Sequence, residues 1–138
     1  MSLPRIVVGD DDRHVLNFVE LLLRRDFDVV RAADGKQVLE RVNGELPALV
    51  LLDSRMPGMS GLETLALLRA DPSTRMLPVF LMSSDRTPVF RRKVLAAGAN
   101  GFLAKPFTAK GLRTLLQSGR GVEAPAASVA PSETDVPA

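Results

Sequence analysis

The stretch ALVLLDSRMPG, residues 48–58, decides the fold of this chain. Five apolar residues in succession end at the carboxylate of Asp53, and a turn containing Pro57 and Gly58 follows. An uninterrupted apolar run of this kind is typical of a strand that is buried on both faces, as in parallel sheets. Asp53 is therefore predicted to lie at the carboxyl end of a central strand, which is the edge where open α/β sheets bind ligands.

Strands and helices alternate on both sides of this stretch. The predicted strands are residues 5–9, 27–32, 48–52, 78–82 and 101–104, and each is followed by a segment with helical periodicity. The side chains of the first helix expected to face the core are Val15, Phe18, Val19, Leu22 and Leu23. Five strand–helix units imply an α/β fold with a doubly wound parallel sheet, and the flavodoxin-like (βα)5 winding has the strand order 2-1-3-4-5.

The composition limits the class of protein. The 138 residues fit one domain, predicted over residues 1–121, and the Ala- and Pro-rich residues 122–138 are expected to form a flexible tail or the stub of a linker. The chain has no cysteine, no apolar run of membrane-spanning length and no signal-peptide pattern, so a cytoplasmic location without membrane contact is expected. There are 18 basic and 16 acidic residues, and three of the acids follow residue 121, so residues 1–121 carry about +5. This mild excess of positive charge is compatible with an ordinary solvated surface and equally with the binding of acidic partners.

Polar side chains stand at the carboxyl ends of four predicted strands. Asp10 and Asp11 follow the first strand, and Asp53 ends the third. Ser83 follows the fourth strand and Lys105 the fifth. Because these four strands are neighbours in the predicted order, their polar ends should converge in one pocket, at the switch point between the first and third strands.

The three carboxylates predict a magnesium site. Carboxylates held close together repel one another, and a hard divalent cation with oxygen ligands offsets this repulsion. We expect Asp11 and Asp53 to coordinate Mg²⁺ directly and Asp10 to act through water. The backbone carbonyl of Arg55 could supply a further oxygen.

The same residues suit phosphoryl transfer. The Asp53 carboxylate would attack phosphorus and become an acyl phosphate, while Mg²⁺ and the Lys105 ammonium offset charge on the phosphoryl oxygens. The Ser83 hydroxyl could donate a hydrogen bond to one of these oxygens. That bond would draw its loop inward and turn a local change of charge into a change of packing.

Four segments strongly resemble the receiver domain of bacterial two-component response regulators. They are IVVGDDD (6–12), LLDSRMPGMSG (51–61), PVFLMS (78–83) and GFLAKPF (101–107), and the resemblance covers about residues 4–118. Any one segment would be a weak signal, but all four in register with the strand ends make a specific one.

The resemblance implies a role for each residue at the strand ends. Asp53 would accept a phosphoryl group from a sensor histidine kinase or a histidine phosphotransfer protein. Asp10 and Asp11 would hold Mg²⁺. Lys105 would contact the phosphoryl group, and its peptide bond to Pro106 would be cis.

The resemblance also implies a conformational switch. Ser83 would be the switch hydroxyl and Phe102 the switch aromatic residue. The surface of the fourth helix, fifth strand and fifth helix would bind an output partner, or a second copy of the chain after phosphorylation.

Some positions depart from the commonest pattern of this family. Gly9 stands in place of a larger apolar residue, which should loosen the end of the first strand, and Ser84 stands where Ala or Gly is frequent and could narrow access to the phosphoryl group. Arg55 and Asp85 flank the predicted pocket. They could pair across its mouth and thereby affect the lifetime of the phosphate.

Two other functions would use an Asp or a fold of this kind. A haloacid-dehalogenase-like phosphatase would need a second carboxylate two residues after its nucleophile, where this chain has Arg55. A flavodoxin-like cofactor binder would need a phosphate loop rich in Ser, Thr or Gly after the first strand. The carboxylates at positions 10–12 would instead repel a flavin phosphate.

The motifs do not reveal the output of the chain. A stand-alone regulator, a phosphate shuttle and a receiver fragment of a larger regulator all fit the sequence. Binding of nucleic acid by this chain alone is disfavoured, because the basic residues 91–93 are typical of a solvated helix face and no helix-turn-helix is recognisable. His14 has no partner in the sequence pattern that would give it a role.

Overall fold

A computed structural model describes residues 2–119 of the chain, and the predicted tail at 122–138 lies outside the described residues. The strands are β1 (Arg5–Gly9), β2 (Asp28–Ala32), β3 (Leu49–Asp53), β4 (Val79–Ser83) and β5 (Gly101–Ala104). The helices are α1 (Arg13–Leu23), α2 (Gly35–Gly44), α3 (Gly61–Ala70), α4 (Pro88–Ala96) and α5 (Ala109–Gly119). Within this part of the chain, every helix is too short or too polar to cross a bilayer.

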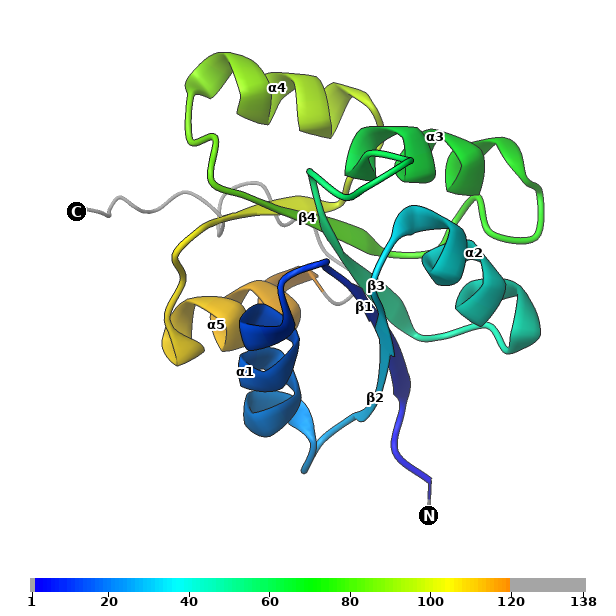
Figure 1. The fold of residues 1–138 in the computed structure, drawn as a ribbon, viewed down its shortest axis with the longest axis vertical. Coiled ribbons are helices and arrows are strands. Elements are labelled where there is room, and N and C mark those ends of the chain that lie inside the picture. The colour runs from blue at the N-terminus through cyan, green and yellow to red at the C-terminus, as the bar shows by residue number, and fades with distance from the viewer. Residues whose placement is uncertain (1, 120–138) are drawn as a thin grey trace.

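The five strands form one parallel sheet in the order β2-β1-β3-β4-β5. Helices α1 and α5 cover one face of the sheet, while α2, α3 and α4 cover the other (Figure 1). The predicted flavodoxin-like fold and its strand order are therefore confirmed. The order changes direction between β1 and β3, so the crevice of a doubly wound sheet falls between these two strands.

Two hydrophobic cores, one on each face, explain the uninterrupted apolar run of β3. Leu49 and Leu51 pack in the core under α1 and α5. Val50 and Leu52 pack in the core under α2, α3 and α4. Because successive side chains of a strand point to opposite faces, both faces of β3 must be apolar, and every one of its residues is buried.

Polar side chains begin four of the helices. Those preceding α1, α2, α3 and α4 are Asp12, Asp34, Ser60 and Thr87, and each accepts a hydrogen bond from a backbone N–H of the first turn. The capping box of α3 is complete, because the Glu63 carboxylate also accepts the backbone N–H of Ser60. Such bonds satisfy donors that the helix cannot pair internally, and so they fix where each helix starts after its strand.

The face of α1 that meets the core differs from the predicted one. Leu16, Val19 and Leu23 are buried, whereas Phe18 keeps 39% of its surface exposed. The buried stripe thus runs through Leu16, and the prediction that Phe18 faces the core was wrong. The Phe18 ring instead lies at the margin, with its centroid 5.9 Å from that of Phe107 on the segment after β5.

The end of β1 is tightly packed at Gly9, contrary to the expectation that this glycine loosens the strand. A Cβ added to Gly9 would lie 2.5 Å from Cγ2 of Val38 and 3.3 Å from Cδ1 of Leu52. Side chains of α2 and β3 therefore fill the space that a larger residue would take. The glycine allows α2 to approach the sheet closely beside the strand end that leads to Asp10.

Candidate functional site

The carboxyl ends of β1, β3, β4 and β5 bring the predicted site residues to one edge of the sheet. Asp10 directly follows β1, Asp53 and Ser83 are the last residues of β3 and β4, and Lys105 directly follows β5. The predicted convergence of Asp10, Asp53 and Lys105 is observed, although Asp10 and Lys105 are 95 positions apart in the chain.

The Lys105 ammonium bridges two carboxylates. Its Nζ lies 2.7 Å from Oδ2 of Asp10 and 2.8 Å from Oδ1 of Asp53. The Asp10 side chain is fully buried, and those of Asp53 and Lys105 are 9% and 19% exposed. Charged hydrogen bonds this short, between groups largely removed from water, hold the three side chains in a defined arrangement.

Burial is the main influence on the two acids. It raises the pKa of Asp10 and of Asp53 above the ordinary value for an aspartate, although hydrogen bonds from Lys105 offset part of the effect. Burial alone would lower the pKa of Lys105, but its bonds to the two carboxylates outweigh burial and raise that pKa. The ammonium therefore stays charged, while both carboxylates ionise less readily than exposed ones.

The acidic residues fit a divalent cation. Carboxylate oxygens of Asp10, Asp11 and Asp53 lie within 4.8 Å of one another, and Asp11 is exposed, so the group opens to solvent on one side. Three carboxylates and the Lys105 ammonium leave two formal negative charges uncompensated. Hard oxygen ligands, an excess of negative charge and access to water suit Mg²⁺. The backbone carbonyl of Arg55 stays a predicted further ligand.

Ser83, the predicted switch hydroxyl, has a partner that was not predicted from the sequence. Ser83 is buried, and its Oγ accepts hydrogen bonds from Oγ of Ser54 at 2.9 Å and from the backbone N–H of Asp85 at 3.0 Å. Ser54 directly follows the candidate phosphoacceptor and is itself buried. The pairing of Asp53 with Met82 across β3 and β4 places Ser54 beside Ser83, so knowledge of the strand register could have revealed this contact.

The predicted switch aromatic residue, Phe102, is directed into the core in this structure. It is 3% exposed and packs with the residues under α2, α3 and α4. Its ring meets the edge of Phe90 on α4, with centroids 6.3 Å apart. Phe102 thus joins β5 to α4, while its role as a switch stays a prediction.

Gly61 is a second residue whose importance the sequence did not indicate. Its backbone N–H donates to the carbonyl of Ser54 at 2.9 Å, which ties the start of α3 to the end of β3. A Cβ at this position would lie 2.2 Å from the carbonyl oxygen of Asp53. Only a glycine lets α3 begin so close to the backbone of the candidate phosphoacceptor.

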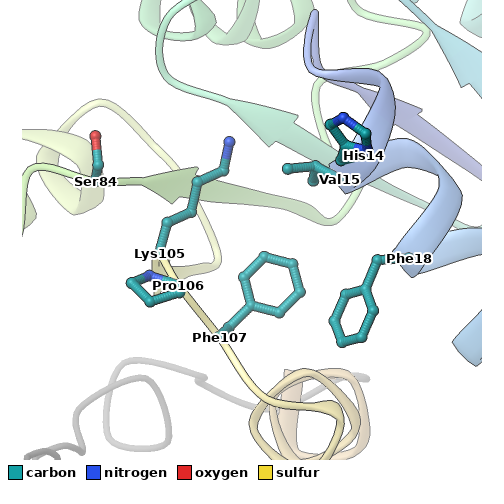
Figure 2. Close-up of a pocket in the computed structure, with 7 residues that line it drawn as sticks. All are labelled: His14, Val15, Phe18, Ser84, Lys105, Pro106 and Phe107. Atoms are coloured by element: carbon teal, nitrogen blue, oxygen red, sulfur yellow. The ribbon is translucent and has the colours of Figure 1, made fainter.

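An apolar groove lies beside the site, between α1 and the segment after β5 (Figure 2). Figure 2 shows Lys105 extended between Ser84 on one side and His14 and Val15 on the other, with the rings of Phe18 and Phe107 facing each other below. The Lys105 side chain therefore belongs both to the carboxylate cluster and to the wall of this groove.

The expected ion pair between Arg55 and Asp85 is not formed in this structure. Arg55 is exposed, and neither side chain takes part in an ion pair within the described residues 2–119. Hydrogen bonds from the backbone and hydroxyl of Thr87 lower the pKa of Asp85, and the charge of Arg55 lowers it further. The two charges therefore influence each other without contact.

The Lys105–Pro106 peptide bond is cis, as the family resemblance implied.

Comparisons with known proteins agree with this geometry. The family model described as the response regulator receiver domain matches residues 6–117. The DNA-binding response regulator MtrA of Mycobacterium tuberculosis is 35% identical over 139 residues, which cover 97% of this chain and 60% of MtrA. The chain thus spans less than two thirds of the length of that relative.

Two solved structures share the fold closely. The chemotaxis response regulator CheY4 of Vibrio cholerae has a TM-score of 0.81 at 25% identity, covering 86% of this chain and 99% of CheY4. The receiver domain of the sensor histidine kinase PA1611 of Pseudomonas aeruginosa, solved with a magnesium ion in its active-site cleft, has a TM-score of 0.79 at 27% identity, covering 87% of this chain and 99% of that domain. The chain belongs to the family of response regulator receiver domains, which are regulatory signalling domains of two-component systems.

Proposed function

We propose that this chain is a phosphorylation-controlled switch whose phosphoacceptor is Asp53. The observation that carries the proposal is the bridge of Lys105 between Asp10 and Asp53, at 2.7 and 2.8 Å, beside the exposed carboxylate of Asp11. This arrangement supplies a nucleophile, a fixed cation for phosphoryl oxygens and a set of metal ligands in one place.

The phosphodonor is a phosphohistidine of a sensor histidine kinase or of a histidine phosphotransfer protein. A bond forms between an Asp53 oxygen and phosphorus while the P–N bond of the phosphohistidine breaks. The imidazole leaves with the electron pair of that bond and takes up a proton from water. Lys105 offsets part of the effect of burial on the Asp53 carboxylate and then pairs with an oxygen of the transferred group.

The acidic residues would hold Mg²⁺, with Asp11 and Asp53 as direct ligands, Asp10 acting through water and the Arg55 carbonyl as a further candidate. The ion would offset negative charge on the phosphoryl oxygens during transfer. The chain would catalyse only its own phosphorylation and dephosphorylation, in the cytoplasm where its donor presents the phosphohistidine.

The switch connects Asp53 to a distant surface. A phosphoryl oxygen on Asp53 offers the Ser83 hydroxyl a new acceptor, and movement of Ser83 alters the loop that leads into α4. Phe102 packs against Phe90 of α4, so a shift of that loop changes the packing between β5 and α4. The surface of α4, β5 and α5 would then bind an output partner or a second phosphorylated copy.

The donor protein would approach over the apolar groove of Figure 2. Lys105 forms part of that groove, so a protein that brings its phosphohistidine to the Lys105 ammonium must lie against neighbouring groove residues such as Phe18 and Phe107. The exposed part of Phe18 supplies apolar surface for this contact.

Incubation with phosphoramidate and Mg²⁺, followed by mass spectrometry of the intact protein, tests the proposal. We expect a gain of one phosphoryl group that hydroxylamine removes, and no gain in the Asp53→Asn variant. The exposed carboxylate Asp28, at the opposite end of the sheet, provides the control variant Asp28→Asn, which should be labelled normally. Continuous turnover of a phosphomonoester would instead support a phosphatase, and transfer from the labelled protein to a phosphotransfer histidine would support a shuttle.

A further inference from the structure

The residue after the candidate phosphoacceptor, Ser54, forms a buried pair with Ser83. The two Oγ atoms are 2.9 Å apart, and Ser54 and Ser83 are 8% and 2% exposed. The backbone around the pair is fixed, because Ser54 N–H donates to the carbonyl of Met82 and Lys105 N–H donates to that of Ser83, both at 2.8 Å. These bonds hold the two serines side by side in this state, and rotation of the Ser83 side chain is enough to break the pair.

The hydrogen-bonding capacity of Ser83 is largely used in this state. A hydroxyl has two acceptor lone pairs and one donor proton. Ser83 Oγ accepts from Ser54 Oγ and from the Asp85 N–H, which occupies both lone pairs. Among residues 2–119, no hydrogen bond joins the Ser83 hydroxyl to the side chain of Asp53 or Lys105. The Ser83 proton is used by neither bond, but with both lone pairs engaged the O–H has one direction left, and in this state it makes no bond to the candidate phosphoacceptor.

We infer that Ser54 is a positioning residue, which holds the Ser83 hydroxyl in the orientation of the unphosphorylated state. The inference rests on the proposed function. For Ser83 to turn and donate to a phosphoryl oxygen on Asp53, it must leave Ser54. The Ser54 hydroxyl is then left in a buried position without its partner, which opposes the switched state. Ser54 thus sets how readily the domain switches, although it touches no phosphoryl oxygen.

Replacing Ser54 by alanine removes this opposition. The unphosphorylated state loses one buried hydrogen bond, and the switched state no longer contains an unpaired hydroxyl. A net hydrogen bond of ordinary strength corresponds to about a threefold to tenfold change in an equilibrium constant. Ser54→Ala should therefore bind a phosphoryl analogue about threefold to tenfold more tightly than the wild type.

Isothermal titration calorimetry with beryllofluoride and Mg²⁺ tests the inference, since the chain has no Trp or Tyr to report binding by fluorescence. Four proteins are compared: the wild type, Ser54→Ala, Ser83→Ala and the double variant. If Ser54 acts through Ser83, the gain in affinity disappears when Ser83 is already alanine. Thr114→Ala, which removes an exposed hydroxyl from α5, is the control and should match the wild type.

The outcomes separate this inference from the proposed function. The inference is supported if Ser54→Ala binds beryllofluoride more tightly than the wild type and this gain in affinity is absent in the Ser83→Ala background. Equal or weaker binding by Ser54→Ala, or an advantage that persists without the Ser83 hydroxyl, overturns it while the proposed function stands. A wild type that binds no beryllofluoride and is not labelled at Asp53 overturns the proposed function itself.

Discussion

Gly61 offers the sharpest test of how the backbone of the candidate phosphoacceptor, Asp53, is held. In Gly61→Ala the new Cβ would lie 2.2 Å from the Asp53 carbonyl oxygen and 2.9 Å from Cα of Ser54, where ordinary contact begins at 3.4 Å. Both neighbours are backbone atoms, so no side-chain rotation relieves the clash. The start of α3 must move by about 1 Å, and overpacking of this kind costs about 1–3 kcal/mol.

Thermal unfolding followed by far-ultraviolet circular dichroism measures the effect. For a domain of this size about 1 kcal/mol corresponds to roughly 4 °C, so the Tm of Gly61→Ala should fall by roughly 4–12 °C. Gly44 at the end of α2 is the matched control, because a Cβ there meets nothing within 4 Å. Gly44→Ala should leave the Tm unchanged or raise it slightly, since alanine favours the helix. A Gly61→Ala protein as stable as the wild type would refute the close approach of α3.

Three further predictions concern the charged cluster. Burial raises the pKa of Asp53 above its ordinary value of 3.8, so the folded state holds this proton more tightly than the unfolded state. The stabilisation that this Asp53 proton gives the folded state is therefore complete below pH 3.8, and it is lost as the pH rises through the raised pKa of Asp53. In Mg²⁺-free buffer, the Tm of Asp53→Asn minus the Tm of the wild type should therefore increase from acidic to neutral pH. A difference that stays constant over this pH range would contradict the predicted direction of the pKa shift. Added Mg²⁺ should raise the wild-type Tm, with about 1.4 kcal/mol of stabilisation at ten times its dissociation constant, and do so much less in Asp53→Asn. Lys105→Gln should slow labelling by phosphoramidate about 10²–10³-fold. The same variant should bind Mg²⁺ more tightly in calorimetry, because one positive charge that competes with the ion is gone. Weaker Mg²⁺ binding would count against the bridge of Lys105 between Asp10 and Asp53.

The fold was predictable because its signals are local. A strand such as residues 49–53, apolar at every position until its terminal carboxylate, is compatible with only a few kinds of sheet, and the polar caps at Asp12 and Ser60 mark helix starts regardless of what packs on them. The convergence of Asp10, Asp53 and Lys105 then follows from the strand order alone.

The details that were missed depend on neighbours. In α1, Leu16 lies three residues before Val19 and Phe18 lies three residues after Val15, so both fit a helical stripe and periodicity could not decide which one is buried. That choice depends on α5 and on the segment carrying Phe107. At Gly9, the space of the absent side chain is filled by Val38 and Leu52, which the strand's own sequence cannot show.

The contacts that position the site were hidden for the same reason. The Ser54–Ser83 bond requires the register between β3 and β4, which is fixed by pairing across strands and not by either strand alone. The close approach of Gly61 to Asp53 depends on how α3 returns to the sheet.

The proposed function requires that Asp53 alone, among the three neighbouring carboxylates of Asp10, Asp11 and Asp53, receives the phosphoryl group. Reduction of the phosphoramidate-treated protein with borodeuteride converts an acyl phosphate to an alcohol, so the modified aspartate becomes a deuterium-marked homoserine that peptide sequencing by mass spectrometry can place. We expect the deuterium mark at position 53 alone, and only when Mg²⁺ is present during phosphorylation. A mark at position 10 or 11, or none at all, would contradict it.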